Sequence, residues 1–392
     1  MRITDLTATI VAVPFAEPER WAFGVRHGLA SVILEVTTDE GVVGIGEAAG
    51  YPTPEVVVAV VAALRPLVVG EDPQRVERII KLMDVVGTWH HVGSSSPALG
   101  AVEMACWDIV GKVCGQPLVN LFGGRVRDRV SYFHYLARKD PAATAADAAK
   151  AVASGFRTCY LKVGWGAPAD DIQLVEAITA SAGPDLRLRV DANESWSTGA
   201  AVRTIAEMER FGLELVEQPV SGRNLSEMAY VRSRISTPLL ANEASWTRQD
   251  ALEVIRHGAA DVISVDNQMD GGLLNMKRAA GICEAAALPV VKHSLGELGV
   301  ATYAALHVIA STPNFLYANQ AYGAFLTDDV LAGCDALPYE DGHLAVPDGP
   351  GIGVTLDRDK MGRYAELYAR DGERFSFRDP NTTRATPVIP KA

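Results

Sequence analysis

The first hundred residues alternate apolar and polar positions in short runs. Such runs cover residues 10–13, 31–36 and 42–46, and Asp39-Glu40-Gly41 separates the last two. Strict alternation on both sides of a turn predicts an antiparallel hairpin. Helical periodicity follows at residues 54–69, 73–86 and 98–113, the last ended by Gly115 and Pro117. We therefore expect an α+β capping domain over residues 1–125.

From about residue 130, short β-branched runs alternate with helical stretches. Eight such runs occur, at residues 130–136, 158–163, 186–191, 213–217, 238–243, 261–266, 289–293 and 315–319. This order predicts an α/β fold, a (β/α) TIM-type barrel, over residues 126–333. A doubly wound sheet would need a glycine-rich phosphate turn after its first strand, and the sequence has none. We expect residues 334–392, with one helix at 361–368, to pack back on the capping domain.

A polar residue ends six of these runs, at intervals of 23 to 27 residues. They are Asp191, Glu217, Glu243, Asp266, His293 and Asn319. Because the carboxyl ends of barrel strands open on one face, these side chains should converge. Three carboxylates that meet there repel one another unless a cation lies between them. Carboxylate oxygens favour Mg²⁺, with Mn²⁺ as the alternative, over zinc.

Each acidic residue also has a purely structural interpretation. Asp or Glu at a strand end can cap the helix that follows, and for Asp191 or Glu243 alone this explanation has equal weight. Three equally spaced carboxylates, each after an apolar strand, favour a shared site.

Several motifs together resemble the enolase superfamily, and within it the mandelate racemase and muconate lactonizing enzyme group. They are Lys162-Val163-Gly164, Leu188-Arg189-Val190-Asp191-Ala192-Asn193, Val216-Glu217-Gln218-Pro219, Leu240-Ala241-Asn242-Glu243, Asp266 before Gly271-Gly272, and the segment from Ala101 to Asp108 with Leu121-Phe122-Gly123-Gly124. The resemblance covers nearly the whole chain.

The resemblance implies an enzyme that binds a substrate carboxylate on Mg²⁺ and removes the adjacent proton to form an enediolate. Asp191, Glu217 and Glu243 match the metal ligands, and Lys162 matches the base on one substrate face. His293 with Asp266 resembles the Asp-His dyad of the mandelate racemase-like subgroup, in which the carboxylate orients the imidazole. A surface lysine and a core histidine are the alternatives.

Other positions depart from the family pattern. Muconate lactonizing relatives carry lysine where this chain has Asp266, which disfavours a cycloisomerase. Tyr160 replaces a second lysine, and Asn319 stands where mandelate racemase has a glutamate acid. We expect Tyr160, Asn193 and Asn319 to contact substrate.

The expected reaction is dehydration of a hydroxy acid or sugar acid, with racemisation or epimerisation as the alternative. A catalytically silent binding protein is less consistent with Lys162, Asp266 and His293 all being present. Substrate specificity is expected to depend on four residues near the first hairpin: Trp21, Phe23, Arg26 and Tyr51. Among them, Arg26 could pair with a second carboxylate of the substrate. All four can instead simply pack the cap on the barrel.

Composition argues against nucleic acid and membranes as partners, and the family resemblance implies a small-molecule carboxylate substrate. The formal net charge is -12, and no dense block of Lys or Arg suits nucleic acid. The five cysteines are dispersed, as expected for a reducing cytoplasm, and no segment predicts a signal peptide or membrane span. The family resemblance implies a homo-oligomer.

Overall fold

The computed structural model describes residues 1–88 and 95–372. Its N-terminal part is an antiparallel sheet covered by helices. Its strands are β1 (Ile3–Trp21), β2 (Gly24–Thr38) and β3 (Val43–Ala49), and its helices are α1 (Pro54–Val68), α2 (Val76–Thr88) and α3 (Ser96–Cys114). The pairing of Thr37 with Val43 confirms the predicted hairpin. Helical spacing on α1 buries Val57, Val61 and Leu64 in the core of this region.

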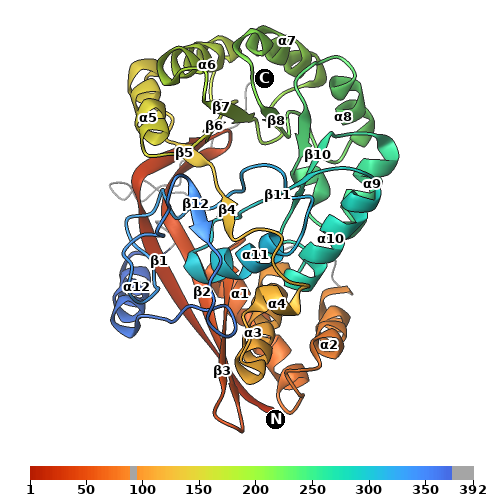
Figure 1. Cartoon of the computed structure of the whole chain (residues 1–392), viewed down its shortest axis with the longest axis vertical. Coiled ribbons are helices and arrows are strands. Elements are labelled where there is room, and N and C mark those ends of the chain that lie inside the picture. Colours follow the sequence, from red (N-terminus) through yellow and green to blue (C-terminus); the bar gives the residue numbers. More distant parts are fainter. Residues whose placement is uncertain (89–94, 373–392) are drawn as a thin grey trace.

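The β1–β2 hairpin extends well past the sheet and reaches the barrel strands (Figure 1). The register shifts between Pro14 and Glu19, after which Glu19 pairs with Arg26 and Trp21 with Gly24. Glu19 and Arg26 are buried. Buried polar residues interrupt the apolar alternation, so the sequence pattern did not reveal this part of the hairpin.

Seven parallel strands form the barrel wall in the order β11-β10-β9-β8-β7-β6-β5. These strands are β5 (His134–Leu136), β6 (Thr158–Lys162), β7 (Arg187–Asp191), β8 (Leu215–Glu217), β9 (Leu239–Ala241), β10 (Val262–Val265) and β11 (Val290–Lys292). The helices that follow them are α5 (Pro141–Ala153), α6 (Pro168–Ala182), α7 (Thr198–Met208), α8 (Leu225–Arg232), α9 (Arg248–His257), α10 (Leu273–Ala285) and α11 (Gly299–Ala310), with short 3₁₀ turns at Glu209–Phe211 and Glu243–Ser245. Helices α5 to α10 lie in an arc outside the strands (Figure 1). The predicted TIM-type fold is confirmed.

The eighth predicted strand, at residues 315–319, forms only single bridges. Phe315 bridges to Val290 and Asn319 bridges to Tyr132, both in parallel orientation, so this segment spans the gap between the two ends of the sheet. The first predicted strand is divided in two: β4 (Arg129–Ser131) pairs with β12 (His343–Ala345) instead of joining the barrel. The short helix α4 (Leu118–Leu121) precedes it.

The barrel interior contains a separate apolar cluster of Leu215, Leu240, Val262 and Val291. Side chains two residues apart on a strand point to the same face. The side chains of Glu217 and His293 therefore point inward, as those of Leu215 and Val291 do. They lie two residues further along their strands, nearer the barrel mouth.

Two N-terminal carboxylates cap barrel helices. Glu47 accepts hydrogen bonds from the N–H groups of Leu298 and Ala301 at the start of α11, at 2.6 and 2.9 Å. Glu103 accepts from Leu273 and Leu274 at the start of α10, at 2.9 and 3.0 Å. Burial raises the pKa of Glu103 to about 7. The N-terminal part thus supplies acceptors that these helices lack.

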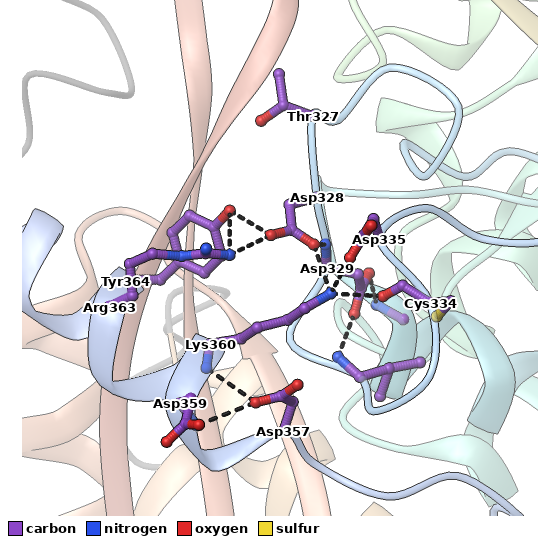
Figure 2. A network of polar contacts seen from close by, with 12 residues as sticks. Thr327, Asp328, Asp329, Cys334, Asp335, Asp357, Asp359, Lys360, Arg363 and Tyr364 are labelled. Atoms are coloured by element: carbon purple, nitrogen blue, oxygen red, sulfur yellow. Dashed lines mark hydrogen bonds and ion pairs between the residues drawn. The ribbon is translucent and has the colours of Figure 1, made fainter.

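Helix α12 (Arg358–Asp371) packs against β1 and is fastened by a polar network to the loop after the eighth segment. Lys360 Nζ lies 2.8 Å from carboxylate oxygens of both Asp328 and Asp335, and Tyr364 donates its hydroxyl to Asp328 at 2.7 Å (Figure 2). The C-terminal segment therefore returns to the N-terminal sheet, although its residues 373–392 lie outside the described part. The exact boundaries at 125 and 333 stay predictions. No helix in the described ranges is long and apolar enough to cross a bilayer.

Candidate active site

The three predicted metal ligands lie at the carboxyl ends of neighbouring strands. Asp191 ends β7, Glu217 ends β8, and Glu243 begins the 3₁₀ turn after β9. Asp191 Oδ1 accepts from the N–H of Asn193 at 2.7 Å, and Asn193 Nδ2 donates to Glu243 Oε1 at 2.8 Å. Burial and the charge of Asp191 raise the pKa of Glu243 to about 8 and that of Glu217 well above its ordinary value. These carboxylates therefore destabilise one another's ionised forms.

The donor set fits a divalent cation. Glu217 Oε1 and Glu243 Oε2 are buried and have no hydrogen-bond partner within the described residues. Buried acceptors are rarely left unsatisfied, and hard carboxylate oxygens suit Mg²⁺ or Mn²⁺. Even so, no three His, Cys, Asp or Glu side chains of residues 1–88 and 95–372 are already grouped around one metal position. Asp191 also forms an ion pair with Lys162.

Lys162, at the end of β6, is buried beside Asp191. Its Nζ lies 2.5 Å from Asp191 Oδ2 and 3.2 Å from the hydroxyl of Tyr160, which also donates to Asp191. Burial would lower the pKa of Lys162, but the charges of Asp191 and Glu19 outweigh it and raise this pKa. Tyr160 therefore lies behind the lysine as a hydrogen-bond donor to the carboxylate.

On the opposite side, His293 Nδ1 lies 2.7 Å from Asp266 Oδ2. The other oxygen of Asp266 accepts from the N–H groups of Gln268 and Met269, the latter at 3.0 Å. Burial opposes ionisation of Asp266, yet its bond to His293 lowers its pKa below the ordinary value. Nδ1 is committed to Asp266, which leaves Nε2 for a substrate.

Lys292, next to His293, is directed elsewhere. It is fully buried and forms an ion pair with Glu297. Adjacent side chains on a strand point to opposite faces, and Lys292 does not line the cavity that His293 lines.

A cavity of about 240 Å³ lies between the barrel mouth and the N-terminal hairpin. Lys162 and His293 both line it, and so do Asn193 and Glu243. From the N-terminal part it is lined by Trp21, Arg26 and Tyr51. The predicted acid/base residues and three of the four predicted specificity residues therefore share one cavity.

Three predicted substrate contacts do not line it. Phe23 packs edge-on against Trp21, with ring centroids 5.2 Å apart, and Tyr160 lies behind Lys162. Asn319 accepts from the backbone N–H of Lys292 at 2.9 Å and donates to backbone carbonyls at 3.3 Å. Its amide thus stabilises the closure of the barrel.

Sequence reasoning missed six lining residues: Asn242, Trp246, Ser294, Leu295, Gln320 and Tyr322. All follow strand ends by a few positions. Their place just after each predicted strand was the available signal, but no residue type marked them as functional.

The N- and C-terminal parts of the chain match two family models. Residues 3–123 match the mandelate racemase / muconate lactonizing enzyme N-terminal domain, and residues 143–360 match the enolase C-terminal domain-like model. The chain is 30% identical to a chloromuconate cycloisomerase of Cupriavidus pinatubonensis over 94% of its length and 100% of that protein. It is 31% identical to the L-Ala-D/L-Glu epimerase of Bacillus subtilis, over 90% of this chain and 97% of that protein.

A solved structure is similar to this chain over nearly its whole length. An enolase from Thermobispora bispora, complexed with magnesium and formate, superposes with a TM-score of 0.88 at 31% identity, covering 96% of this chain and 95% of that one.

Proposed function

We propose, since this chain belongs to the mandelate racemase and muconate lactonizing enzyme group of the enolase superfamily, that it is a racemase or epimerase of an α-substituted carboxylate. One observation carries the proposal: Lys162 and His293, from opposite sides of the barrel mouth, line the same cavity. A 1,1-proton transfer needs a proton carrier on each face of the substrate carbon.

Each side chain has a definite part in this proposal. Lys162 takes or returns the proton on one face, and His293 does so through Nε2 on the other. Asp266 holds Nδ1–H, which keeps the imidazole in the useful tautomer and stabilises its protonated form. Tyr160 and Asn193 orient the oxygens of Asp191 through their hydrogen bonds.

Asp191, Glu217 and Glu243 would hold a divalent cation, Mg²⁺ by the chemistry of these oxygens with Mn²⁺ as the alternative. When bound, the cation supplies positive charge to the substrate carboxylate and stabilises the negative charge that develops on it. A magnesium-containing relative supports this choice.

The dehydration expected from the sequence has less support. The two relatives described above are a cycloisomerase and an epimerase. Cycloisomerisation is disfavoured by Asp266, which stands where muconate lactonizing relatives carry lysine. Dehydration would use the same two side chains with loss of a β-hydroxyl, and the experiment below detects it as a separate product.

The test incubates the enzyme with Mg²⁺ in D₂O and a panel of N-acylated amino acids, sugar acids and aromatic α-hydroxy acids. We expect NMR to show deuterium at the α-carbon together with the opposite configuration. Loss of water without inversion would establish dehydration instead. If no acid in the panel exchanges or reacts, and EDTA changes nothing, the proton-transfer proposal is wrong. Cytoplasmic location and homo-oligomerisation stay predictions.

A further inference from the structure

A buried polar cluster joins the tip of the β1–β2 hairpin to the barrel mouth. Arg26 Nε lies 2.5 Å from Glu19 Oε2, and its terminal nitrogens donate to the hydroxyls of Tyr51 and Tyr322, the latter at 2.9 Å. Tyr135 and Tyr322 donate in turn to Glu19 Oε1, at 2.5 and 3.1 Å. The protein itself therefore uses three of the five N–H donors of Arg26.

The same cluster neutralises the charge of Arg26. Burial opposes ionisation of Glu19, but the charges of Arg26 and Lys162 lower its pKa, so Glu19 is a carboxylate anion. Glu19 is 1% and Arg26 6% exposed, and little solvent screens the pair. A group in the cavity next to Arg26 consequently meets an ion pair with no net charge.

The surfaces around Arg26 are flat and mostly apolar. Its guanidinium lies 5.1 Å from the ring centroid of Trp21 and 5.6 Å from that of Tyr322. Trp246 and Leu295 add further nonpolar lining. Within the described residues, the other charged or titratable side chains that line the cavity, apart from tyrosines, are Lys162, Glu243 and His293, which belong to the reactive end.

We propose that the substrate carries one carboxylate, at its reactive end, and an uncharged far end whose oxygen accepts a hydrogen bond from Arg26. This rests on the proposed function, since it takes the Lys162 side of the cavity as the reactive end. A second carboxylate beside Arg26 would lose its hydration next to the fixed anion of Glu19. An amide or hydroxyl oxygen needs only one of the remaining N–H groups. This substrate class replaces the dicarboxylate expected from Arg26 in the sequence.

The experiment compares nearly isosteric ligands that differ in the charge of the far end. Calorimetry with the full-length protein and Mg²⁺ measures binding of N-acetyl-L-glutamine and N-acetyl-L-glutamate, and of the corresponding asparagine and aspartate pair. We expect the amide member to bind at least about tenfold more tightly. Glu19→Gln removes the anion and frees the charge of Arg26, so the preference should disappear or reverse.

Glu17→Gln is the matched control. Glu17 lies on the same strand, is half exposed and pairs with Lys139 at 3.0 Å, outside the cavity lining. This variant should keep the wild-type preference. The inference is overturned if the wild type binds the dicarboxylates as tightly as the amides, if neither pair binds, or if folded Glu19→Gln keeps the wild-type ratio. Binding without α-deuterium exchange would support the inference and count against the proposed reaction, so the two failures are distinguishable.

Discussion

Asp266 holds His293 through a 2.7 Å contact between Oδ2 and Nδ1, while backbone N–H groups of the following loop hold its other oxygen. The imidazole is therefore oriented by a carboxylate that is itself fixed. Asp266→Asn should lower kcat by about 100-fold or more, because the amide favours the wrong tautomer and cannot stabilise the protonated ring. Kinetics in both directions measure this, with Asp84→Asn, a partly exposed residue of α2, as the control. An Asp266→Asn enzyme of near wild-type kcat would contradict the dyad.

Lys162 and His293 should act on opposite substrate faces. Lys162→Ala is expected to retain α-deuterium exchange with one enantiomer only, and His293→Asn with the other only. Each variant lacks the proton carrier of one face and keeps the carrier of the other. NMR with each pure enantiomer in D₂O gives the answer. If both variants lose exchange of the same enantiomer, the two-face assignment is wrong.

Added Mg²⁺ should raise the Tm of the purified protein. Asp191, Glu217 and Glu243 oppose one another's ionisation, and a cation that binds only the folded chain stabilises it by mass action. Glu243→Gln weakens the site, so its Tm should rise less with Mg²⁺, although its metal-free Tm should be at least that of the wild type. Scanning calorimetry with and without EDTA measures both quantities. An equal Mg²⁺ effect in both proteins would exclude Glu243 as a ligand.

His307 should contribute less to the stability of the fold in mild acid than at neutral pH. Its Nδ1 accepts from the N–H of Val119 at 3.2 Å and its Nε2 donates to the carbonyl of Ile352 at 3.0 Å, so it is buried in the neutral form. Burial lowers its pKa from 6.5 to about 4. Between these pH values the unfolded chain binds the proton and the folded chain does not. The contribution of His307 to the free energy of unfolding should therefore fall as pH falls below about 6.5, by up to about 3 kcal/mol in total.

Urea unfolding between pH 7.5 and 5 tests the role of His307. His307→Gln should be less stable at neutral pH, because it loses fitted hydrogen bonds, and should show a shallower pH dependence. The exposed His257→Asn should keep the wild-type slope. Identical slopes for wild type and His307→Gln would assign the acid sensitivity to other groups.

Two glycines of the α10 region should respond oppositely to alanine. Gly272 has a φ of +143°, and an added Cβ would lie 2.6 Å from Cδ of the fixed Glu103. Gly272→Ala should therefore destabilise the fold by about 1–3 kcal/mol. Gly281 lies inside α10 with nothing within 4 Å of an added Cβ, so Gly281→Ala should stabilise by about 0.5–1 kcal/mol. Urea unfolding compares them, and equal effects would refute the close approach at Gly272.

Sequence spacing predicted the barrel and the strand ends well, because parallel strands buried on both faces form nearly continuous apolar runs. It could not predict that residues 315–319 would form isolated bridges, since strand length depends on twist and closure. Nor could it show that Glu19 and Arg26 neutralise each other. That relation depends on a register shift in β1 and on tyrosines more than 100 residues away.

The helix caps supplied by Glu47 and Glu103 bear on the construction of chimaeras. A barrel separated from its own N-terminal part would expose the starts of α10 and α11 to whatever replaced it. A transplanted N-terminal part must therefore bring a carboxylate to the start of each helix, as well as new specificity residues. Exchange of the whole N-terminal part should alter substrate choice only when the donor carries acidic residues at these two positions. Grafting the hairpin tip alone leaves both helix starts hydrogen-bonded.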